Sequence, residues 1–293
     1  MLGAHEDALL AATNVSVEKL DEYILKSKQL KGMPLIKFAA RFVWDMLCGP
    51  TPETRTICLP EKTMAILRLQ AQMDITASSD GEKQPFISDG DVLTAWTIRA
   101  VATSLPRPRP MTALHAMNAR FRLPSLSRAP GVYLQNMVVP ACTYLSAEVA
   151  AGPLGAIALS NRQHLAEEAT EAQVLASLRE QYHTKDPSKL LYSDPDALVM
   201  PFTNWTKADL LGTVNFRAAV TCTGDGQQSR CNPPGTPIFH HASTTKQSRT
   251  TRLMVVILGK DHEGNYWLTM TMSPLAWQTI KDSLQRLQQQ VIY

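Results

Sequence analysis

The chain has 293 residues, of which 44% are hydrophobic and 19% charged, and its formal net charge is +3. This composition is typical of a folded chain with a sizeable core and excludes an intrinsically disordered protein. The small net charge, the lack of a basic tail and an aromatic content of 6% argue against a nucleic-acid partner.

The cysteine pattern and the hydropathy narrow the class of protein further. None of the five cysteines forms a C-x-x-C pair, so neither a metal site nor a redox motif is indicated. No apolar run reaches the roughly 18 residues that a membrane span needs, and the first residues lack the pattern of a secretory signal. We expect a cytoplasmic monomer without a membrane partner, a bound metal or a permanently bound cofactor.

The first part of the chain predicts helices and one short strand. Apolar residues at helical spacing predict two helices between residues 16 and 47. A strand is predicted at 55–59 and an amphipathic helix at 61–73. Residues 76–85 are polar and contain Gly and Pro, which is typical of a linker.

A helix and a strand are predicted next. Asp89 is the expected N-cap of a helix that ends before the proline-rich connector 106–110. Alternating polar and apolar residues predict a strand over 111–123. In such a strand Arg120 and Arg122 share one face.

The second half alternates helices with strands. An apolar stretch at 137–139 precedes helices at 154–167 and 170–182. A strand is predicted at 197–202, followed by one or two helical turns at 204–210.

The C-terminal part predicts a hairpin and a helix. Strands at 252–259 and 266–272 are joined by a turn, and a helix capped by Ser273 runs to about residue 291. Helices and strands alternate without an internal repeat, so we expect an α/β chain with a mixed β-sheet and flanking helices.

The common catalytic motifs are absent. The sequence contains no G-x-x-x-x-G-K-[ST], no G-x-S-x-G and no H-E-x-x-H, and the glycines at 224–226 lack the third glycine of a dinucleotide fingerprint. His240 and His241 have no partner at metal-ligand spacing. The search for catalytic motifs therefore leaves the function open.

Four segments in chain order resemble the second half of fungal BAHD-type acyltransferases, which are chloramphenicol acetyltransferase-like. The matching segments are Phe86–Arg99 (FISDGDVLTAWTIR), Asn118–Asn136 with its R-x-R-like start, Phe202–Ala219, and Gly259–Trp267 (GKDHEGNYW). Each motif alone is weak, and their order makes the resemblance moderately specific. It covers essentially the whole chain.

The resemblance implies the C-terminal half of a two-domain acyltransferase. Residues 1–80 correspond to a remnant of the first domain with the crossover segment, and residues 81–293 to the C-terminal acyltransferase domain. Acyl-CoA, most simply acetyl-CoA, is then the co-substrate. The partner is a small hydroxylated acceptor such as a terpenoid, meroterpenoid or polyketide.

Two departures from the family pattern affect the chemistry. The H-x-x-x-D motif, whose His deprotonates the acceptor in the family, is absent, so no catalytic residue is assigned. His115, His164 and His183 all lack an Asp four residues on, and we expect His164 to be a surface residue. Asn215 stands where the family's D-F-G-W-G motif has its structural Asp.

The resemblance also suggests binding residues. Ser88, Arg120 and Arg122 are the predicted contacts to CoA, with a solvated strand edge as the alternative for the two arginines. Asp91 is expected to cap the helix that follows Ser88. The predicted substrate-binding residues are Asn204, Trp205 and Asn215, with plain core packing as the alternative for Trp205.

Three functions follow, in order of preference. The first is an acyl-CoA-dependent O-acyltransferase acting on a fungal secondary metabolite. The alternative is a truncated, catalytically inactive fragment or pseudoenzyme that only binds a ligand or partner. A transcription-regulatory protein is third, because no helix-turn-helix beside a basic stripe is evident.

Overall fold

A six-stranded mixed β-sheet forms the centre of the molecule. The computed structural model describes residues 22–77, 85–127, 136–184, 186, 190–221, 232–240 and 251–292. The strand order is β1-β6-β5-β4-β2-β3, with β1 Glu53–Leu59, β2 Met111–Asn118, β3 Val138–Leu145, β4 Leu198–Asn204, β5 Met254–Lys260 and β6 Tyr266–Met272. The β2–β4 and β4–β5 pairs are parallel and the others antiparallel. The predicted mixed sheet is confirmed.

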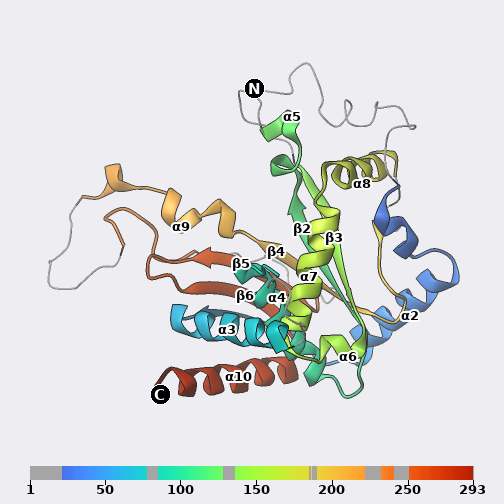
Figure 1. Ribbon diagram of the computed structural model, residues 1–293, viewed down its shortest axis with the longest axis horizontal. Helices are drawn as coiled ribbons and strands as arrows, with labels where there is room; N and C mark the ends of the chain where they lie inside the picture. The colour runs from blue at the N-terminus through green and yellow to red at the C-terminus, as the bar shows by residue number, and fades with distance from the viewer. Residues whose placement is uncertain are drawn as a thin grey trace.

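Helices form a layer on one face of this sheet (Figure 1). The layer consists of α3 Glu61–Ala77, α4 Asp89–Ser104, α7 Leu154–Glu168 and α10 Pro274–Ile292, which contact one another in pairs. The remaining helices are α2 Met33–Cys48, α5 Pro124–Ser127, α6 Ala147–Ala150, α8 Glu171–His183 and α9 Leu210–Thr213, with 3-10 turns η2 Ile24–Lys28, η3 Ala119–Phe121, η5 Thr206–Ala208 and η6 Arg217–Ala219.

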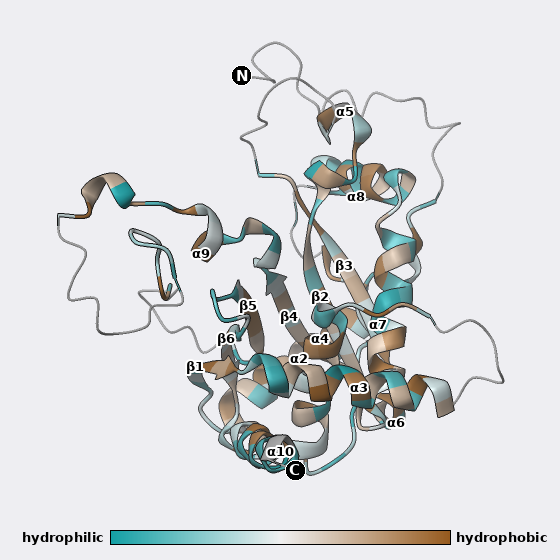
Figure 2. Ribbon diagram, turned by 60° about the vertical axis from the view of Figure 1, so that its left-hand side comes forward, coloured by the Kyte–Doolittle hydropathy of each residue, from teal (hydrophilic) through white to brown (hydrophobic). Residues whose placement is uncertain are grey.

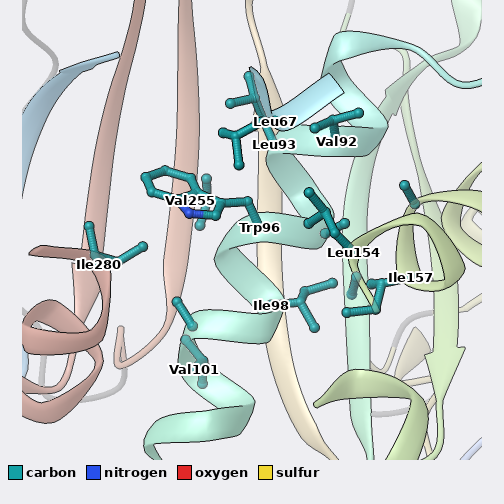
Figure 3. Packing of buried hydrophobic residues seen from close by; sticks show 14 of the residues in the cluster. Leu67, Val92, Leu93, Trp96, Ile98, Val101, Leu154, Ile157, Val255 and Ile280 are labelled. Carbon is teal, nitrogen blue, oxygen red and sulfur yellow. The ribbon is translucent and has the colours of Figure 1, made fainter. Parts of the chain in front are cut away.

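The main core lies between the sheet and the helix layer, and α4 runs through its middle. Figure 3 shows apolar side chains leaving α4 on several sides, with Trp96 towards Val255 and Ile98 towards Ile157. Trp96 is 1% exposed, and its indole N–H donates to Ser283 Oγ on α10 at 2.9 Å. In Figure 2 the central strands are pale to brown, while α10 carries polar residues along part of its surface.

The strand predicted at 111–123 is shorter than expected. The strand ends at Asn118 rather than at residue 123, because the Asn118 carboxamide accepts a hydrogen bond from the backbone N–H of Arg120 and starts a 3-10 turn. Arg120 and Arg122 therefore do not share a strand face. Strand β3 is also longer than the apolar stretch at 137–139.

Helix α2 has no buried residue, and most of its residues are exposed. Charged pairs hold it to the rest of the fold: Lys37 and Arg41 contact Asp196, and Arg109 contacts Asp45. Apolar residues on its surface include Trp44, at 67% exposed. The first half of the segment predicted as helix from residue 16 lies outside the described residues or forms the 3-10 turn η2.

The predicted division at residue 80 stays a prediction. β1 and α3, from its N-terminal side, belong to the same sheet and the same core as the later elements. Within the described part of the chain, no helix has the length and apolar character needed to cross a membrane.

We expect Trp96→Ala to lower the free energy of unfolding by about 3–5 kcal/mol, because it empties a large volume in the core. Urea unfolding monitored by circular dichroism measures this loss. Leu69→Ala is the control, since Leu69 is 60% exposed on α3, and it should change stability by less than about 0.5 kcal/mol. Equal effects of the two substitutions would contradict this packing.

A buried carboxyl group lies at the end of α7, against strand β3. Glu168 at the end of α7 is 4% exposed, and its Oε2 accepts a hydrogen bond from the backbone N–H of Cys142 at 2.7 Å. Burial raises the pKa of Glu168 to about 8, although the Cys142 N–H opposes the shift. The folded protein therefore retains this proton at pH values where the unfolded chain has lost it.

This raised pKa predicts a pH dependence of stability. Because the folded pKa of Glu168 exceeds its ordinary value of 4.5, the contribution of Glu168 is fully present below about 4.5 and is lost as pH rises towards 8. Glu168→Gln keeps an acceptor for Cys142 and should flatten the fall in unfolding free energy between pH 5 and pH 8. Glu171→Gln, at an exposed position on α8, should leave the fall unchanged.

Candidate functional site

A large cavity opens where strands β2 and β4 part. The two strands pair in parallel as far as His115 and Phe202, and their last residues then line opposite sides of a cavity of about 1040 Å³. Its wall is made by Arg68, Gln72, Phe86, Ile87, Ser88, Asp89, Gly90, Ala116, Met117, Asn118, Arg120, Phe121, Arg122, Val138, Thr203, Asn204, Trp205, Thr206, Lys207, Ala208 and Tyr266.

The N-terminus of α4 forms one wall of this cavity. Ser88, rather than the predicted Asp89, is the N-cap: its Oγ accepts from the N–H of Asp91, and the Asp91 carboxylate accepts from the N–H of Ser88 at 2.8 Å. This reciprocal arrangement is a capping box. The capping role predicted for Asp91 is confirmed.

Positive charge predominates on the cavity wall. Four cationic side chains line it, namely Arg68, Arg120, Arg122 and Lys207, against the single carboxylate of Asp89. Asp89 is already paired with Arg68 and accepts a hydrogen bond from the hydroxyl of Tyr266 at 2.8 Å. Together with the positive end of the α4 dipole, this charge distribution favours an anionic ligand.

The opposite wall carries an amide and an indole. Asn204 Oδ1 accepts from the N–H of Thr206 at 2.9 Å, and the Trp205 indole N–H donates to Thr203 Oγ1 at 3.1 Å. The Trp205 ring stacks on His240, with centroids 6.1 Å apart. Trp205 is only partly buried, so its ring both packs and lines the cavity.

A glycine lets the two walls approach each other. A Cβ on Gly90, in the first turn of α4, would lie 3.0 Å from Asn204 Nδ2. Any larger residue at position 90 would push the Asn204 amide away from the helix N-terminus.

The structure brings five of the six predicted binding residues together and leaves one out. Ser88, Arg120, Arg122, Asn204 and Trp205 all line the large cavity. Asn215 does not line the cavity.

Asn215 is exposed on the chain after α9, where its Oδ1 accepts from the N–H of Arg217 at 2.7 Å. The binding role of each of the six residues stays a prediction.

A second, smaller cavity adjoins the first, and one of the strands that line it carries a histidine that the sequence analysis did not select. It has a volume of about 340 Å³ and is lined by Leu114, His115, Ala116, Val138, Val139, Pro140, Pro201, Phe202, Thr203 and Met254. Three residues line both cavities: Ala116, Val138 and Thr203. The smaller cavity is almost entirely apolar. Because side chains alternate along a strand, the His115 ring points to the other face of the sheet from Leu114 and Ala116, towards α7.

His115 belongs to a chain of buried polar groups. Its Nε2 lies 2.8 Å from Asn161 Oδ1 on α7, which also accepts from the hydroxyl of Thr143 at 2.9 Å. Asn161 Nδ2 in turn donates to Asp91 Oδ1 at 2.8 Å. Burial lowers the pKa of His115 to about 4, so the imidazole is uncharged at neutral pH. The partners are far apart in sequence, so no local motif signals this chain.

His164, the nearest sequence match to the missing motif, is held by contacts to α7 and to Tyr144. It is partly buried rather than at the surface, and its ring contacts Tyr144 edge to face at 6.0 Å. Its Nδ1 donates to the carbonyl of Ser160 at 2.8 Å. Among the described residues, no group of three or more His, Cys, Asp or Glu side chains could hold a metal ion.

The fold is that of a chloramphenicol acetyltransferase-like domain, with a cavity whose lining carries more positive than negative side chains. A structure of TRI101 from F. sporotrichioides, complexed with coenzyme A and T-2, superimposes with a TM-score of 0.62. The match covers 94% of this chain and 57% of that one, at 15% identity, and it shows the shared fold. No model of a known protein family matches the chain.

Similar sequences include fungal proteins named as acetyltransferases. Acetyltransferase pyiB of Pyricularia grisea is 31% identical over 99% of this chain and 58% of its own length, and O-acetyltransferase PaAT-2 of Phomopsis amygdali is 32% identical over 92% and 56%. Another relative, 30% identical over 79% of this chain and 48% of its own length, carries the name transcriptional regulator calD in Penicillium decumbens.

These similarities confirm the family resemblance. The chain is related to fungal acyl-CoA-dependent acyltransferases of the BAHD kind, and it spans a little over half the length of the first two curated relatives.

We expect Ser88→Ala to lower the free energy of unfolding by about 1 kcal/mol, because it removes the cap of α4. Thermal unfolding of the purified chain measures the change. Thr103→Ala is the matched control: Thr103 is exposed near the other end of the same helix and bonds only back to its own turn. A loss at Ser88 no larger than at Thr103 would show that the cap contributes nothing.

Proposed function

We propose that this chain is part of an acyl-CoA-dependent O-acyltransferase that moves an acyl group, most simply acetyl, to a hydroxyl of a fungal secondary metabolite. The observation that carries the proposal is the cation-rich cavity at the N-terminus of α4, on a sheet whose strands part at that point. The named acetyltransferase relatives support it.

The cavity suits coenzyme A in both charge and shape. Arg120 and Arg122 can form charge-assisted hydrogen bonds to phosphate oxygens, and Ser88 lies at the N-terminus of α4, the positive end of the helix dipole. A volume of about 1040 Å³ accommodates a large cofactor. In this proposal CoA is a co-substrate that leaves after each cycle, rather than a permanently bound cofactor.

The opposite wall is the proposed contact for the acceptor. The Asn204 amide has a donor group beyond the bond it accepts from Thr206, and the Trp205 ring offers an apolar face. Asn215 lies away from the cavity, so its predicted contact with the acceptor has no geometric support.

The proposed reaction is attack of the acceptor hydroxyl on the thioester carbonyl. The tetrahedral intermediate collapses, the CoA thiolate leaves and takes up a proton, and the ester remains. The hydroxyl must lose its proton to a base within hydrogen-bond reach. This sequence lacks H-x-x-x-D, so the part of the chemistry that we assign to its residues is binding and orientation.

Other functions have less support. The relatives named as acetyltransferases give no support to the inactive-fragment alternative. The name of the relative calD does not point to any regulatory feature of this chain. Cys48, Cys58 and Cys142 are free thiols, which suits the proposed cytoplasmic location. A monomeric state stays a prediction.

Calorimetric titration with CoA tests the site. We expect the double variant Arg120→Gln/Arg122→Gln to bind CoA at least about tenfold more weakly, because charge-assisted hydrogen bonds to phosphate are lost. Arg107→Gln is the control, as Arg107 is exposed on the connector before β2, and it should bind like the wild type. Undiminished CoA binding by the double variant, or none by the wild-type chain, would refute the proposed site.

A further inference from the structure

We infer that Lys207 and Phe121 form a latch across the mouth of the large cavity, and that a phosphate-bearing ligand opens it by drawing the Lys207 ammonium from the ring to its own oxygens. The inference rests on the proposed function only in taking CoA as that ligand. It makes Lys207 a specificity-determining residue, which favours ligands that carry phosphate over ligands that do not.

The position of the contact is the first argument. Strands β2 and β4 are paired only as far as His115 and Phe202. Beyond that point β2 leads into η3, which contains Phe121, and β4 leads into η5, which contains Lys207. Nζ of Lys207 lies 5.8 Å from the centroid of the Phe121 ring, and both side chains line the cavity. The contact therefore joins the two strand ends again on the far side of the opening.

Exposure is the second argument. Phe121 is 63% exposed, and Lys207 is also exposed. A contact between two exposed side chains from opposite walls lies on the solvent side of the cavity, where a ligand enters. Because neither side chain is packed into the core, both can change rotamer without disturbing the fold.

The lack of a carboxylate partner is the third argument. Two other cations beside the cavity are anchored by Asp89: Arg68 forms an ion pair with it, and Lys260 lies 3.5 Å from it as well as over the Tyr266 ring. Among the described residues, no carboxylate is paired with Lys207, whose ammonium lies over an uncharged ring. Lys207 can therefore move onto a ligand without leaving a carboxylate unpaired.

The relative strengths of the two contacts decide which one Lys207 makes. An exposed cation–π contact changes an equilibrium constant by about two- to fivefold, whereas a charge-assisted hydrogen bond to phosphate changes it by about tenfold or more. The ammonium therefore stays over the ring in the free protein and moves to the phosphate in the complex. A ligand without phosphate must open the latch without that compensation.

Calorimetric titration of the 293-residue chain with CoA tests the latch through two substitutions of opposite effect. Phe121→Leu removes the ring and keeps the cation, so CoA should bind about two- to fivefold more tightly. Lys207→Gln removes the ring contact and also the stronger phosphate contact, so CoA should bind at least about twofold more weakly. Phe121→Tyr keeps a ring for the ammonium and should restore the wild-type affinity.

The double variant Phe121→Leu/Lys207→Gln tests whether the two side chains act on each other. Once Lys207 is replaced, the ring has no cation to hold, so its loss should not change the CoA affinity further. Phe216→Leu and Lys281→Gln are matched controls, because both residues are exposed and neither lines the cavity. A Phe121→Leu variant that binds CoA no more tightly than the wild type, or that still gains affinity in the Lys207→Gln background, would overturn the inference.

Proton NMR follows the position of the ammonium directly. In the free protein the Phe121 ring should shift the Hε signals of Lys207 upfield, and CoA or inorganic pyrophosphate should abolish this shift. Pantetheine, the phosphate-free part of CoA, should leave the shift in place, and its loss with pantetheine would contradict selection by phosphate. No CoA binding by the wild type refutes the proposed function, whereas normal CoA binding with an unchanged affinity of Phe121→Leu refutes only the latch.

Discussion

The buried carboxylate of Asp91 ties the functional region together. It is 2% exposed, closes the cap of α4 through Ser88 and accepts from Asn161 on α7. Removing a carboxylate from water is costly unless its lone pairs are satisfied, so these donors are needed wherever Asp91 is ionised. One side chain thereby fixes the start of α4, the amide of α7 and, through that amide, the tautomer of His115.

The parting of β2 and β4 turns this arrangement into a site. The two strands are paired as far as His115 and Phe202, and past that point no ladder hydrogen bonds join them. Each strand end then supplies side chains to a cavity instead of to a neighbouring strand. Because the parallel pair is held rigidly by the helix layer on one face, the position of the opening is set by the core and not by loops.

Local patterns predicted much of the fold and several members of the site. Periodicity located α3, α4, α7 and α10, and the resemblance selected Ser88 and Trp205. The strand at 111–123 was overextended, because Asn118 ends it through a side-chain bond that alternation cannot reveal. His115 was missed for a different reason: its partner Asn161 is 46 positions away, and only the packing of α7 on β2 and β3 brings them together.

The absence of H-x-x-x-D from the sequence and the geometry of His115 both concern which group could remove the proton of an acceptor hydroxyl. An imidazole whose pKa is lowered to about 4 holds a proton too weakly to be an effective general base near neutral pH. The same burial keeps the ring uncharged in that range, so it joins Asn161 as a neutral partner. The place of His115 is therefore in the hydrogen-bond chain that joins β2 to Asn161 and Asp91, and the base for the acceptor is not among the residues assigned here.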